Sequence, residues 1–370
     1  MMGINGRDMS SQGFPLSTDL PVRILILAIR AIGDVVLITP IISLLKKSYP
    51  KGYFAVLVDG PTAEVLANNP SIDRLIVIDR AESQRATIWK RGENWLGLVR
   101  DLRKEHFDVV LDVFSGPRSA ILAYASGAVA RYGEDFRNRG RGFLYNYPIK
   151  IRRDGRHLIE QTLDLVHALL GVNHPQVGGL EIHVTEREKQ QGQVLLAKNN
   201  HEAIRRIGLI PSAGSKWRVW PSERFAELAD VLIETYRAEV VLLGGADDRE
   251  LCHAIVNRMR TPPLDLSGRT TLRELMAVLG ELDLVIANVT GPMHLASALP
   301  KPKVIGLYGA ADTIQYAPWG LNAMMLTKGT KEDAYWFHVD YEKDYEYLCQ
   351  ITVADVLKRV VLMVPDWVEG

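Results

Sequence analysis

The chain has 370 residues, of which 47% are hydrophobic and 24% charged; this composition indicates a folded protein too long for one ordinary domain. Its 44 basic and 44 acidic side chains cancel, which argues against a general nucleic-acid-binding protein, because such a surface would be basic. The two cysteines, Cys252 and Cys349, lie in no metal-ligand spacing and fit a reducing cytoplasm better than a disulfide framework.

We expect no signal peptide or membrane-spanning segment at the amino terminus. Residues 1–21 are polar, lack the apolar core of a signal peptide, and are expected to form a disordered leader. No apolar run reaches the roughly 18 residues that a bilayer-spanning helix needs. We therefore expect a cytoplasmic protein that at most touches the cytoplasmic face of the inner membrane.

The first half of the chain alternates short apolar runs with amphipathic segments. Residues 23–29 (RILILAI) are typical of a strand buried on both faces of a parallel sheet. Residues 35–50 (VVLITPIISLLKKSYP) have the apolar spacing and terminal lysines of a helix. The alternation continues through YFAVLVD, TAEVLANNP, RLIVID, FDVVLDVF and SAILAYASG. This order of elements predicts a doubly wound α/β layer.

The pattern restarts after a polar stretch near residues 171–179, which we interpret as a linker. The later strands and helices are IRRIGLIPSAG, SERFAELADVLIETY, AEVVLLGG, a charged helix beginning near Asp247, LVIANVTG, a helix over 292–299, and KVIGLYG. We predict two Rossmann-like domains, 22–178 and 179–345, facing a central cleft. A helix within 346–370 is expected to pack back toward the amino-terminal domain. Ligands of open parallel sheets bind outside the carboxyl ends of the strands, so the cleft is the expected site.

Asp34 follows the first predicted strand, where a helix begins. An aspartate is ionised at neutral pH, because its unperturbed pKa is about 3.9. Asp34 could therefore be a general base that takes the proton of an acceptor hydroxyl. It could also be an N-cap that satisfies the first amides of the helix, and spacing alone favours the cap.

Residues 211–218 (PSAGSKWR) lie between a predicted strand and a helix. Small residues let the backbone approach a phosphate, the hydroxyl of Ser212 can donate to it, and Lys216 and Arg218 can neutralise it. The G-x-x-x-x-G-K-[ST] spacing of a P-loop is absent. A solvated loop explains the composition equally well.

Residues 288–294 (NVTGPMH) form a second turn from strand to helix. Thr290 and Gly291 would present a hydroxyl and open amides at the positive end of the helix, and Pro292 suits its first turn. This arrangement is a natural seat for a diphosphate. His294 could donate to that diphosphate or be a core histidine, and the motif alone slightly favours the core.

A basic cluster lies between residues 131 and 156, where eight Lys and Arg residues are interleaved with five aromatic ones against three acidic residues. Together with Arg118, its residues Arg137, Arg139 and Arg141 are the candidates for binding a phosphorylated saccharide. A solvated surface loop is an equally good interpretation.

Taken together, the motifs resemble the ADP-heptose:lipopolysaccharide heptosyltransferases, glycosyltransferase family nine. The resemblance is colinear from about residue 22 to the end of the chain. It is strongest in LDLSGRTTLRELMAVLGELDLVIANVTGPMHLASAL, which is similar to the family's L-x-G-x-[ST]-x-L…N-D-[ST]-G-P-M-H-L-A-A-A-L. The other matching stretches are ILILAIRAIGDVVLITPIISLLKKSYP, PSAGSKWRVWPSERFAELAD, YGAADTIQYAPWG and CQITVADVLKRV.

The resemblance implies a GT-B fold, in which the second domain holds most of the donor nucleotide. It implies an inverting transfer of heptose from ADP-heptose to the inner core of lipopolysaccharide, without metal, cofactor or nucleic acid. By position Asp34 matches the catalytic base, and Arg218 falls where the family has a lysine that contacts donor phosphate. Thr290, Gly291 and His294 match the diphosphate turn. Asp247 or Asp248 falls near the acidic residue that binds the nucleotide ribose.

Val289 departs from the resemblance, because the family has an aspartate there that contacts the donor sugar. Valine cannot replace a carboxylate that bonds sugar hydroxyls, and sites built for such bonds typically discriminate by about 10⁴. The donor could be another sugar, or Asn288 could take over the contact. A non-catalytic nucleotide-sugar-binding protein and a GT-B epimerase or hydrolase remain alternatives. A dinucleotide oxidoreductase is disfavoured, since no G-x-G-x-x-G follows the first strand of either domain.

Overall fold

The computed structural model describes residues 21–78, 88–134, 142–153, 155–171, 176–197, 205–311, 313–330 and 340–367. The expected leader, apart from residue 21, lies outside these ranges. Contacts between residues divide the chain into two units, one of Met1–Ala31 with Ile38–Gly178 and one of Ile32–Leu37 with Gly179–Gly370. The short segment Ile32–Leu37 therefore belongs to the second unit, although the chain on both sides of it belongs to the first.

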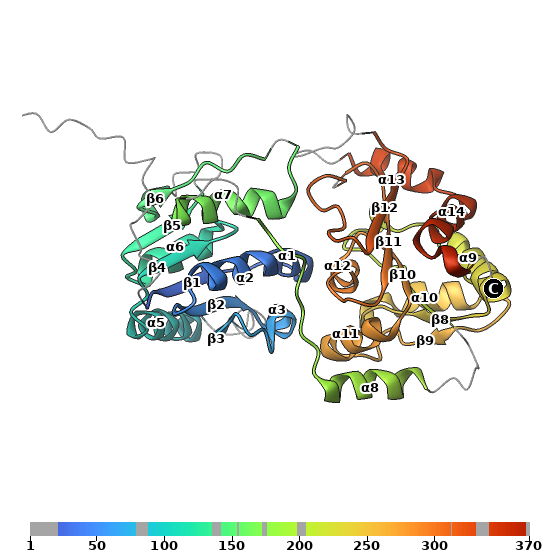
Figure 1. The fold of residues 1–370 in the computed structure, drawn as a ribbon, viewed down its shortest axis with the longest axis horizontal. Helices are drawn as coiled ribbons and strands as arrows, with labels where there is room; N and C mark the ends of the chain where they lie inside the picture. The colour runs from blue at the N-terminus through green and yellow to red at the C-terminus, as the bar shows by residue number, and fades with distance from the viewer. Residues whose placement is uncertain are drawn as a thin grey trace, which may run out of the picture. The chain divides into compact units, whose positions relative to one another are not determined.

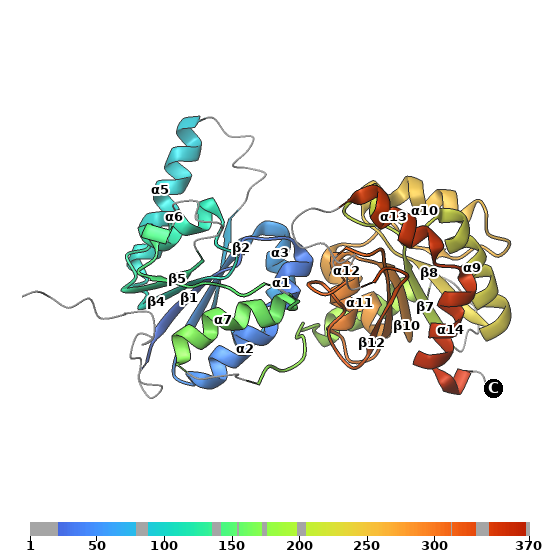
Figure 2. The same cartoon turned by 90° about the horizontal axis from the view of Figure 1, so that it is seen from above.

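The first unit is one parallel sheet covered by helices on both faces. In Figure 2, α5 and α6 lie on one face of the sheet and α2 and α7 on the other. Its elements, with the intervening α1, are β1 (Arg23–Leu27), α1 (Ile32–Leu37), α2 (Thr39–Ser48), β2 (Tyr53–Asp59), α3 (Gly60–Leu66), β3 (Arg74–Ile78), α5 (Ile88–Lys104), β4 (Val109–Asp112), α6 (Pro117–Ala125), β5 (Ala130–Gly133), η3 (Gly142–Leu144), β6 (Tyr147–Pro148) and α7 (Leu158–Leu170).

The strands of the first unit are parallel and follow the order β3-β2-β1-β4-β5-β6. The central strands carry apolar side chains on both faces because helices cover both faces, and β4 is buried throughout. The apolar core includes Leu25, Leu57, Val110 and Leu122. The predicted doubly wound layer is confirmed.

The helix predicted over residues 35–50 is two helices in the structure. α1 ends at Leu37 and α2 begins at Thr39, with Ile38 between them at φ −92° and ψ −5°. Pro40 is the cause, because its ring has no N–H and would clash with the carbonyl four residues earlier in a continuous helix. Proline is well tolerated in the first turn of a new helix, where Pro40 lies.

The second unit repeats the architecture of the first (Figure 1). Its further elements are α8 (Glu186–Leu196), β7 (Arg205–Ile210), η4 (Lys216–Arg218), α9 (Ser222–Tyr236), β8 (Ala238–Leu242), η5 (Ala246–Asp248), α10 (Arg249–Val256), β9 (Leu264–Asp265), α11 (Leu272–Glu281), β10 (Leu284–Asn288), α12 (Gly291–Ser297), β11 (Lys303–Tyr308), β12 (Ala323–Thr327), α13 (Tyr341–Gln350), α14 (Val353–Met363) and η6 (Pro365–Trp367).

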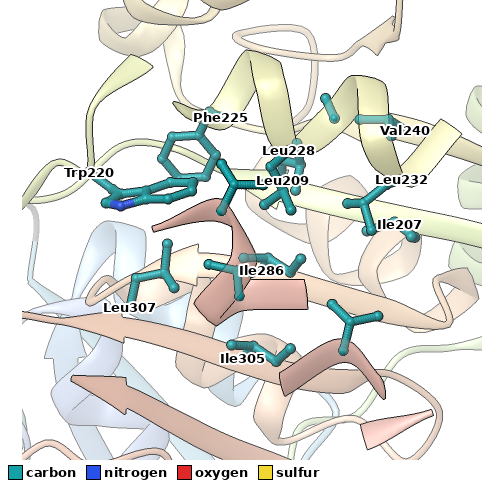
Figure 3. Packing of buried hydrophobic residues seen from close by; sticks show 14 of the residues in the cluster. Ile207, Leu209, Trp220, Phe225, Leu228, Leu232, Val240, Ile286, Ile305 and Leu307 are labelled. Atoms are coloured by element: carbon teal, nitrogen blue, oxygen red, sulfur yellow. The ribbon is translucent and has the colours of Figure 1, made fainter. Parts of the chain in front are cut away.

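The second sheet has the order β9-β8-β7-β10-β11-β12 when it is read from its β9 edge. Counted within each unit, both sheets therefore follow the order 3-2-1-4-5-6, in which ligands bind where the strand order reverses. Figure 3 shows the packing of the second core, in which Trp220 and Phe225 meet with ring centroids 4.9 Å apart. Ile207, Ile286 and Ile305 come from three neighbouring strands of this core.

The carboxyl-terminal helices complete the second core. We expected residues 346–370 to pack toward the amino-terminal domain; instead Leu348, Ile351, Val356 and Val360 are buried in the core of the second unit. The physical reason is the apolar face of α14, which contacts α9, β11 and β12. No helix in the described ranges is long and apolar enough to cross a membrane.

α8 precedes the first strand of the second unit and packs against α11; the described part of the first unit, from residue 21, has no helix in that position. Gly192 lies so close to α11 that an added Cβ would be 2.8 Å from the carbonyl carbon of Ala277. Arg273 donates to both carboxylate oxygens of Glu188, at 2.7 and 2.6 Å. These hydrogen bonds lower the pKa of Glu188 to about 2. A close contact and an ion pair thus attach α8 to the rest of the unit.

Candidate functional site

The strands β7 and β10 are neighbours in the second sheet, so the loops that follow them begin side by side. Ala287 pairs with Ile210 in the parallel register, and the next residues are Asn288 and Pro211. This is the point where the strand order reverses. The two motifs singled out in the sequence, residues 211–218 and 288–294, start at this edge of the sheet.

Asn288 joins the two loops. Its Nδ2 donates to the carbonyl of Pro211 at 2.6 Å, and its Oδ1 accepts from the backbone N–H of Trp220 at 3.2 Å. The side chain is fully buried. The expected contact of Asn288 with the donor sugar stays a prediction; in the structure its amide is bonded to Pro211 and Trp220. Its observed role is to fix the loop after β7 against the end of β10.

The loop after β7 forms the short helix η4. Ser215 caps it by accepting from the N–H of Trp217 at 3.4 Å. Lys216 is exposed, with its Nζ 4.9 Å from the centroid of the Trp217 ring. Arg218 is half-buried, and Ser212 is buried with 8% of its surface exposed. The cations of this loop thus differ, since Lys216 faces solvent and Arg218 is partly enclosed by protein.

Thr290 is the N-cap of α12, in extended geometry at φ −153° and ψ 163°. Its side chain makes no capping hydrogen bond to the helix. Gly291 and Pro292 form the first turn, as predicted for a helix start of this sequence. Val289 is half-buried, and His294 is 3% exposed, so its imidazole lies within the protein.

Within the second unit, α1 packs closely on α12. A Cβ added at Gly33 would lie 3.1 Å from Cδ2 of His294, and one added at Gly291 would lie 3.1 Å from Cβ of Ile32. Such contacts require small residues at both positions. Asp34 is half-buried in the first turn of α1, third in the helix and not at its N-cap. The structure therefore brings Asp34 and the turn at Thr290 onto neighbouring helices.

Asp247 and Asp248 lie in η5, after β8. Asp248 accepts from the N–H of Gly245 at 2.7 Å, and a Cβ at Gly244 would approach its own Cβ to 2.9 Å. Asp247 is exposed. Of the two residues predicted near the ribose, Asp248 shapes the loop, and Asp247 presents its carboxylate to solvent.

The predicted acceptor residues are only partly described. Arg118 is exposed in the first turn of α6. Arg137, Arg139 and Arg141 lie outside the described residues. Other members of the basic cluster are used in ion pairs within the first unit, including Arg153 with Glu134 and Arg156 with Asp164.

Sequence reasoning missed a buried carboxylate in the first unit. Asp112, the last residue of β4, is fully buried; its Oδ1 accepts from the N–H of Ser115 at 2.9 Å and its Oδ2 from the hydroxyl of Tyr145 at 2.7 Å. Burial raises the pKa of Asp112 to about 6, against the lowering effect of bonds from Ser119, Tyr145 and the backbone. Ser115 has a φ of +47°, a strained value for a residue with a side chain.

A second missed carboxylate is Asp344 on α13, which is 3% exposed. The run DYEKDYEY looks uniformly polar, so burial was not apparent from composition. The available signal was the spacing of Asp344 and Leu348, four residues apart and thus on one face of a helix.

Among the described residues, no group of three His, Cys, Asp or Glu side chains could hold a metal ion. Metal-independent chemistry remains a prediction.

Comparisons with known proteins agree on the family. A family model described as glycosyltransferase family 9 (heptosyltransferase) matches residues 95–345, which include the loops after β7 and β10 but not Asp34. The chain is 27% identical over 344 residues to lipopolysaccharide heptosyltransferase 3 of Escherichia coli, covering 91% of this chain and 98% of that protein.

Solved structures share the fold over nearly the whole chain. The crystal structure of a glycosyl transferase family 9 protein from Veillonella parvula DSM 2008 has a TM-score of 0.81 at 24% identity, covering 96% of this chain and 100% of that one. The E. coli heptosyltransferase WaaC with ADP has a TM-score of 0.71 at 20% identity, covering 92% and 100%. Both similarities show the same two-sheet fold.

Proposed function

We propose, from the premise that the chain belongs to glycosyltransferase family 9, that it moves a heptose from ADP-heptose to a saccharide of the lipopolysaccharide inner core. A similar E. coli structure contains ADP and another contains ADP-2-deoxy-2-fluoro heptose, which supports this choice of donor. The observation that carries the proposal is the Asn288 bridge, which fixes a cation-bearing loop beside the helix start at Thr290.

The donor diphosphate would bind at Thr290 and Gly291, where a hydroxyl and backbone amides face the start of α12. Arg218 and Lys216 would neutralise the charge that grows on the leaving ADP. Asp34 would take the proton of the acceptor hydroxyl while its oxygen bonds to the anomeric carbon and the bond from that carbon to the phosphate oxygen breaks. This single displacement inverts the anomeric centre.

The acceptor, location and metal independence belong to the same proposal. Arg118 and the neighbouring arginines would hold a phosphorylated saccharide or glycolipid, and the enzyme would reach it at the cytoplasmic face of the inner membrane.

No metal ion or cofactor is required in this mechanism. Transfer should therefore persist in EDTA, whereas a loss of activity that Mg²⁺ restores would contradict this part.

Val289 favours a second candidate, in which the same reaction uses a different nucleotide sugar. The family resemblance places an aspartate at this position, and a valine cannot bond the sugar hydroxyls. The amide of Asn288 is buried and bonded to Pro211 and Trp220, so a contact with the sugar would have to share or replace these hydrogen bonds. Donor choice is thus the least constrained part of the proposal.

The deciding experiment measures thermal stability with a panel of nucleoside diphosphates and their sugars, followed by transfer to a heptose-deficient core acceptor. A ligand at 100 times its dissociation constant stabilises by about 2.7 kcal/mol, which is readily detected. ADP and ADP-heptose should give the largest shifts. A larger shift with another nucleotide sugar would replace the donor, and no shift with any of them would contradict the proposal.

The proposed base is tested by Asp34→Asn, which keeps the size of the side chain and removes its basicity. We expect transfer to fall by at least ~10²-fold, as is typical for loss of a general base, with ADP affinity changed less than about twofold. Asp101→Asn, at an exposed position of α5, is a matched control for removing one negative charge. Loss of ADP binding in Asp34→Asn would assign Asp34 to structure instead of proton transfer.

A further inference from the structure

The outward face of α6 in the first unit is apolar, although it faces solvent. The inward face of this helix is buried in the first core through Ala120, Leu122 and Ala123. Ile121 and Tyr124, three residues apart and thus on one face of the helix, are 47% and 56% exposed. A surface helix normally presents polar or charged side chains to water, so an apolar outer face needs a reason.

Two further exposed hydrophobic side chains lie beside this face. Val129, just before β5, is 58% exposed, and Phe143, in η3, is 77% exposed. Arg131 joins these segments, since its Cζ lies 5.5 Å from the centroid of the Tyr124 ring and its Nε donates to the carbonyl of Leu144 at 3.0 Å. η3 also packs on α6. We call the four exposed side chains around Arg131 the α6–η3 surface: Ile121, Tyr124, Val129 and Phe143.

The surroundings of the α6–η3 surface are basic. Residues 113–133 and 142–153 contain five Lys or Arg residues and no Asp or Glu, although the charges of the whole chain balance. Arg118 is exposed in the first turn of α6. Arg103, on the neighbouring α5 (Figure 2), is exposed beside the last turn of α6, where its Nε donates to the carbonyl of Ala125 at 2.8 Å. Exposed apolar side chains with cations at their edges are complementary to an anionic lipid surface.

We propose that the α6–η3 surface docks this protein on an anionic membrane, next to a lipid-linked acceptor. Apolar and aromatic side chains enter the boundary of the acyl chains, while guanidinium groups stay with the lipid phosphates. Arg118, which is proposed to hold a phosphorylated glycolipid, and Ile121 are neighbours on one face of α6, so the head group would lie beside the lipid that anchors it. The inference rests on the proposed function for the choice of a membrane as partner.

A second copy of this chain is a poorer occupant of the surface. In a symmetric dimer the same patch meets itself, so the basic residues at its edges would face like charges. Anionic lipid instead supplies the opposite charge over the whole of a flat surface. The experiments below therefore measure lipid binding first and self-association as an outcome that would contradict it.

The first experiment measures co-sedimentation of the full chain with lipid vesicles. The double variant Ile121→Gln with Phe143→Gln removes two exposed apolar side chains and keeps the charge and the Arg131 contacts. The matched control is Val194→Gln with Leu321→Gln, which removes two exposed apolar side chains, 66% and 105% exposed, from the second unit. Because all four side chains are exposed, all these variants should fold, and circular dichroism checks that they do.

Wild type and the control should bind vesicles made of equal amounts of phosphatidylethanolamine and phosphatidylglycerol. Both should bind neutral phosphatidylcholine vesicles at least ~10-fold more weakly, because the attraction of the cations is lost. The double variant should bind the anionic vesicles at least ~10-fold more weakly than wild type. Lack of binding by wild type, unchanged binding by the double variant, or an equal loss in the control would overturn the inference. So would a wild-type dimer in analytical ultracentrifugation that the double variant makes monomeric.

Transfer assays separate this inference from the proposed function. With the core acceptor embedded in the anionic vesicles, the double variant should raise KM at least ~5-fold; with the same saccharide freed of its lipid, kcat/KM should change less than about twofold. An equal loss with both acceptors would overturn the inference, because the surface would then serve the fold or the site. Vesicle binding that depends on Ile121 and Phe143 in a chain that transfers no sugar would retain the docking surface and contradict the proposed function alone.

Discussion

In each unit the fourth strand of the sheet ends in a buried polar side chain, but the two side chains make different hydrogen bonds. Asp112 ends β4 and Asn288 ends β10, the fourth strand of each sheet in the 3-2-1-4-5-6 order. Both are fully buried, and each is followed by a helix that begins near a Gly-Pro pair, Gly116-Pro117 or Gly291-Pro292.

The difference between a carboxylate and an amide explains the two local structures. An amide both donates and accepts, so Asn288 can join a carbonyl and an N–H from a neighbouring loop without burying charge. A carboxylate only accepts, so Asp112 gathers the donors of Ser115 and Tyr145, and burial raises its pKa although these bonds oppose the rise. An uncharged side chain suits the unit proposed to bind a diphosphate, because a buried carboxylate there would repel the ligand.

The largest effect is expected for Asn288→Asp, which replaces the amide nitrogen of the side chain with an oxygen. The carboxylate cannot donate to Pro211 and would be buried unpaired, so we expect a loss of about 3–5 kcal/mol at pH 7 and loss of ADP binding. Chemical denaturation and calorimetric titration measure both effects. Acid should reduce the stability loss, since a protonated carboxyl can donate again. Wild-type stability at pH 7 would contradict the role given to Asn288.

The converse change, Asp112→Asn, should stabilise the protein. Because the folded pKa of about 6 lies above the ordinary value of 3.8, the folded state holds its proton longer, and stability falls as pH rises from about 4 to about 6. Above pH 6 the cost is constant, at about 2–3 kcal/mol. The variant should remove this cost, so the difference between variant and wild-type unfolding free energies should grow from near zero at pH 4. A flat difference would show that the Asp112 carboxyl titrates normally.

A smaller effect tests α8, the helix that precedes the first strand of the second unit. Glu188 has its pKa lowered to about 2 by Arg273, so its stabilisation is present above the ordinary value of 4.5 and is lost as pH falls through about 2. Glu188→Gln should cost about 1 kcal/mol at pH 7, since the pair is partly exposed to solvent. Glu186→Gln, on the exposed first turn of α8, is the control. Equal effects in urea denaturation would contradict a special role for the Arg273 pair.

An effect of similar size, on ligand binding and not on stability, is expected for Thr290→Val, which compares the two helix starts. Gly116, the N-cap of α6, has no side chain to offer a ligand, whereas Thr290 has a hydroxyl that does not cap α12. The variant should weaken ADP binding about fivefold, or about 1 kcal/mol, with an unchanged melting temperature. Adenosine binding serves as the control, because it lacks the phosphates and should not respond.

Periodicity in the sequence was sufficient to predict the two parallel sheets, because strands buried on both faces are continuous apolar runs. It did not show where α14 packs: Val353, Val356 and Val360 define an apolar face, but not the surface that the face covers. Pro40 causes the break at Ile38. The prediction of one continuous helix missed this break because the neighbouring residues have the apolar spacing of a helix.

The site was harder to predict because burial and long-range partners determine what a polar residue does. Asn288 was placed correctly at the strand end, yet its bond to Pro211 spans 77 residues of sequence and leaves no local pattern. Asp344 lies among charged and aromatic residues. Which of them are buried depends on how α13 packs, and the sequence pattern does not show that. The roles of Asp34, Thr290 and Arg218 stay predictions, and the variants above address the first two.

The packing of α14 also has a consequence for how the protein is made. Residues 353–363 close a core whose first strand, β7, begins at Arg205, so a ribosome must add roughly 150 residues before that core can be completed. At ~5–20 residues per second this takes roughly 8–30 s, and from its synthesis until that of α14 the apolar surface of α9 lacks this helix. Nascent chains of this enzyme should therefore bind chaperones through the second unit well after the first unit has folded.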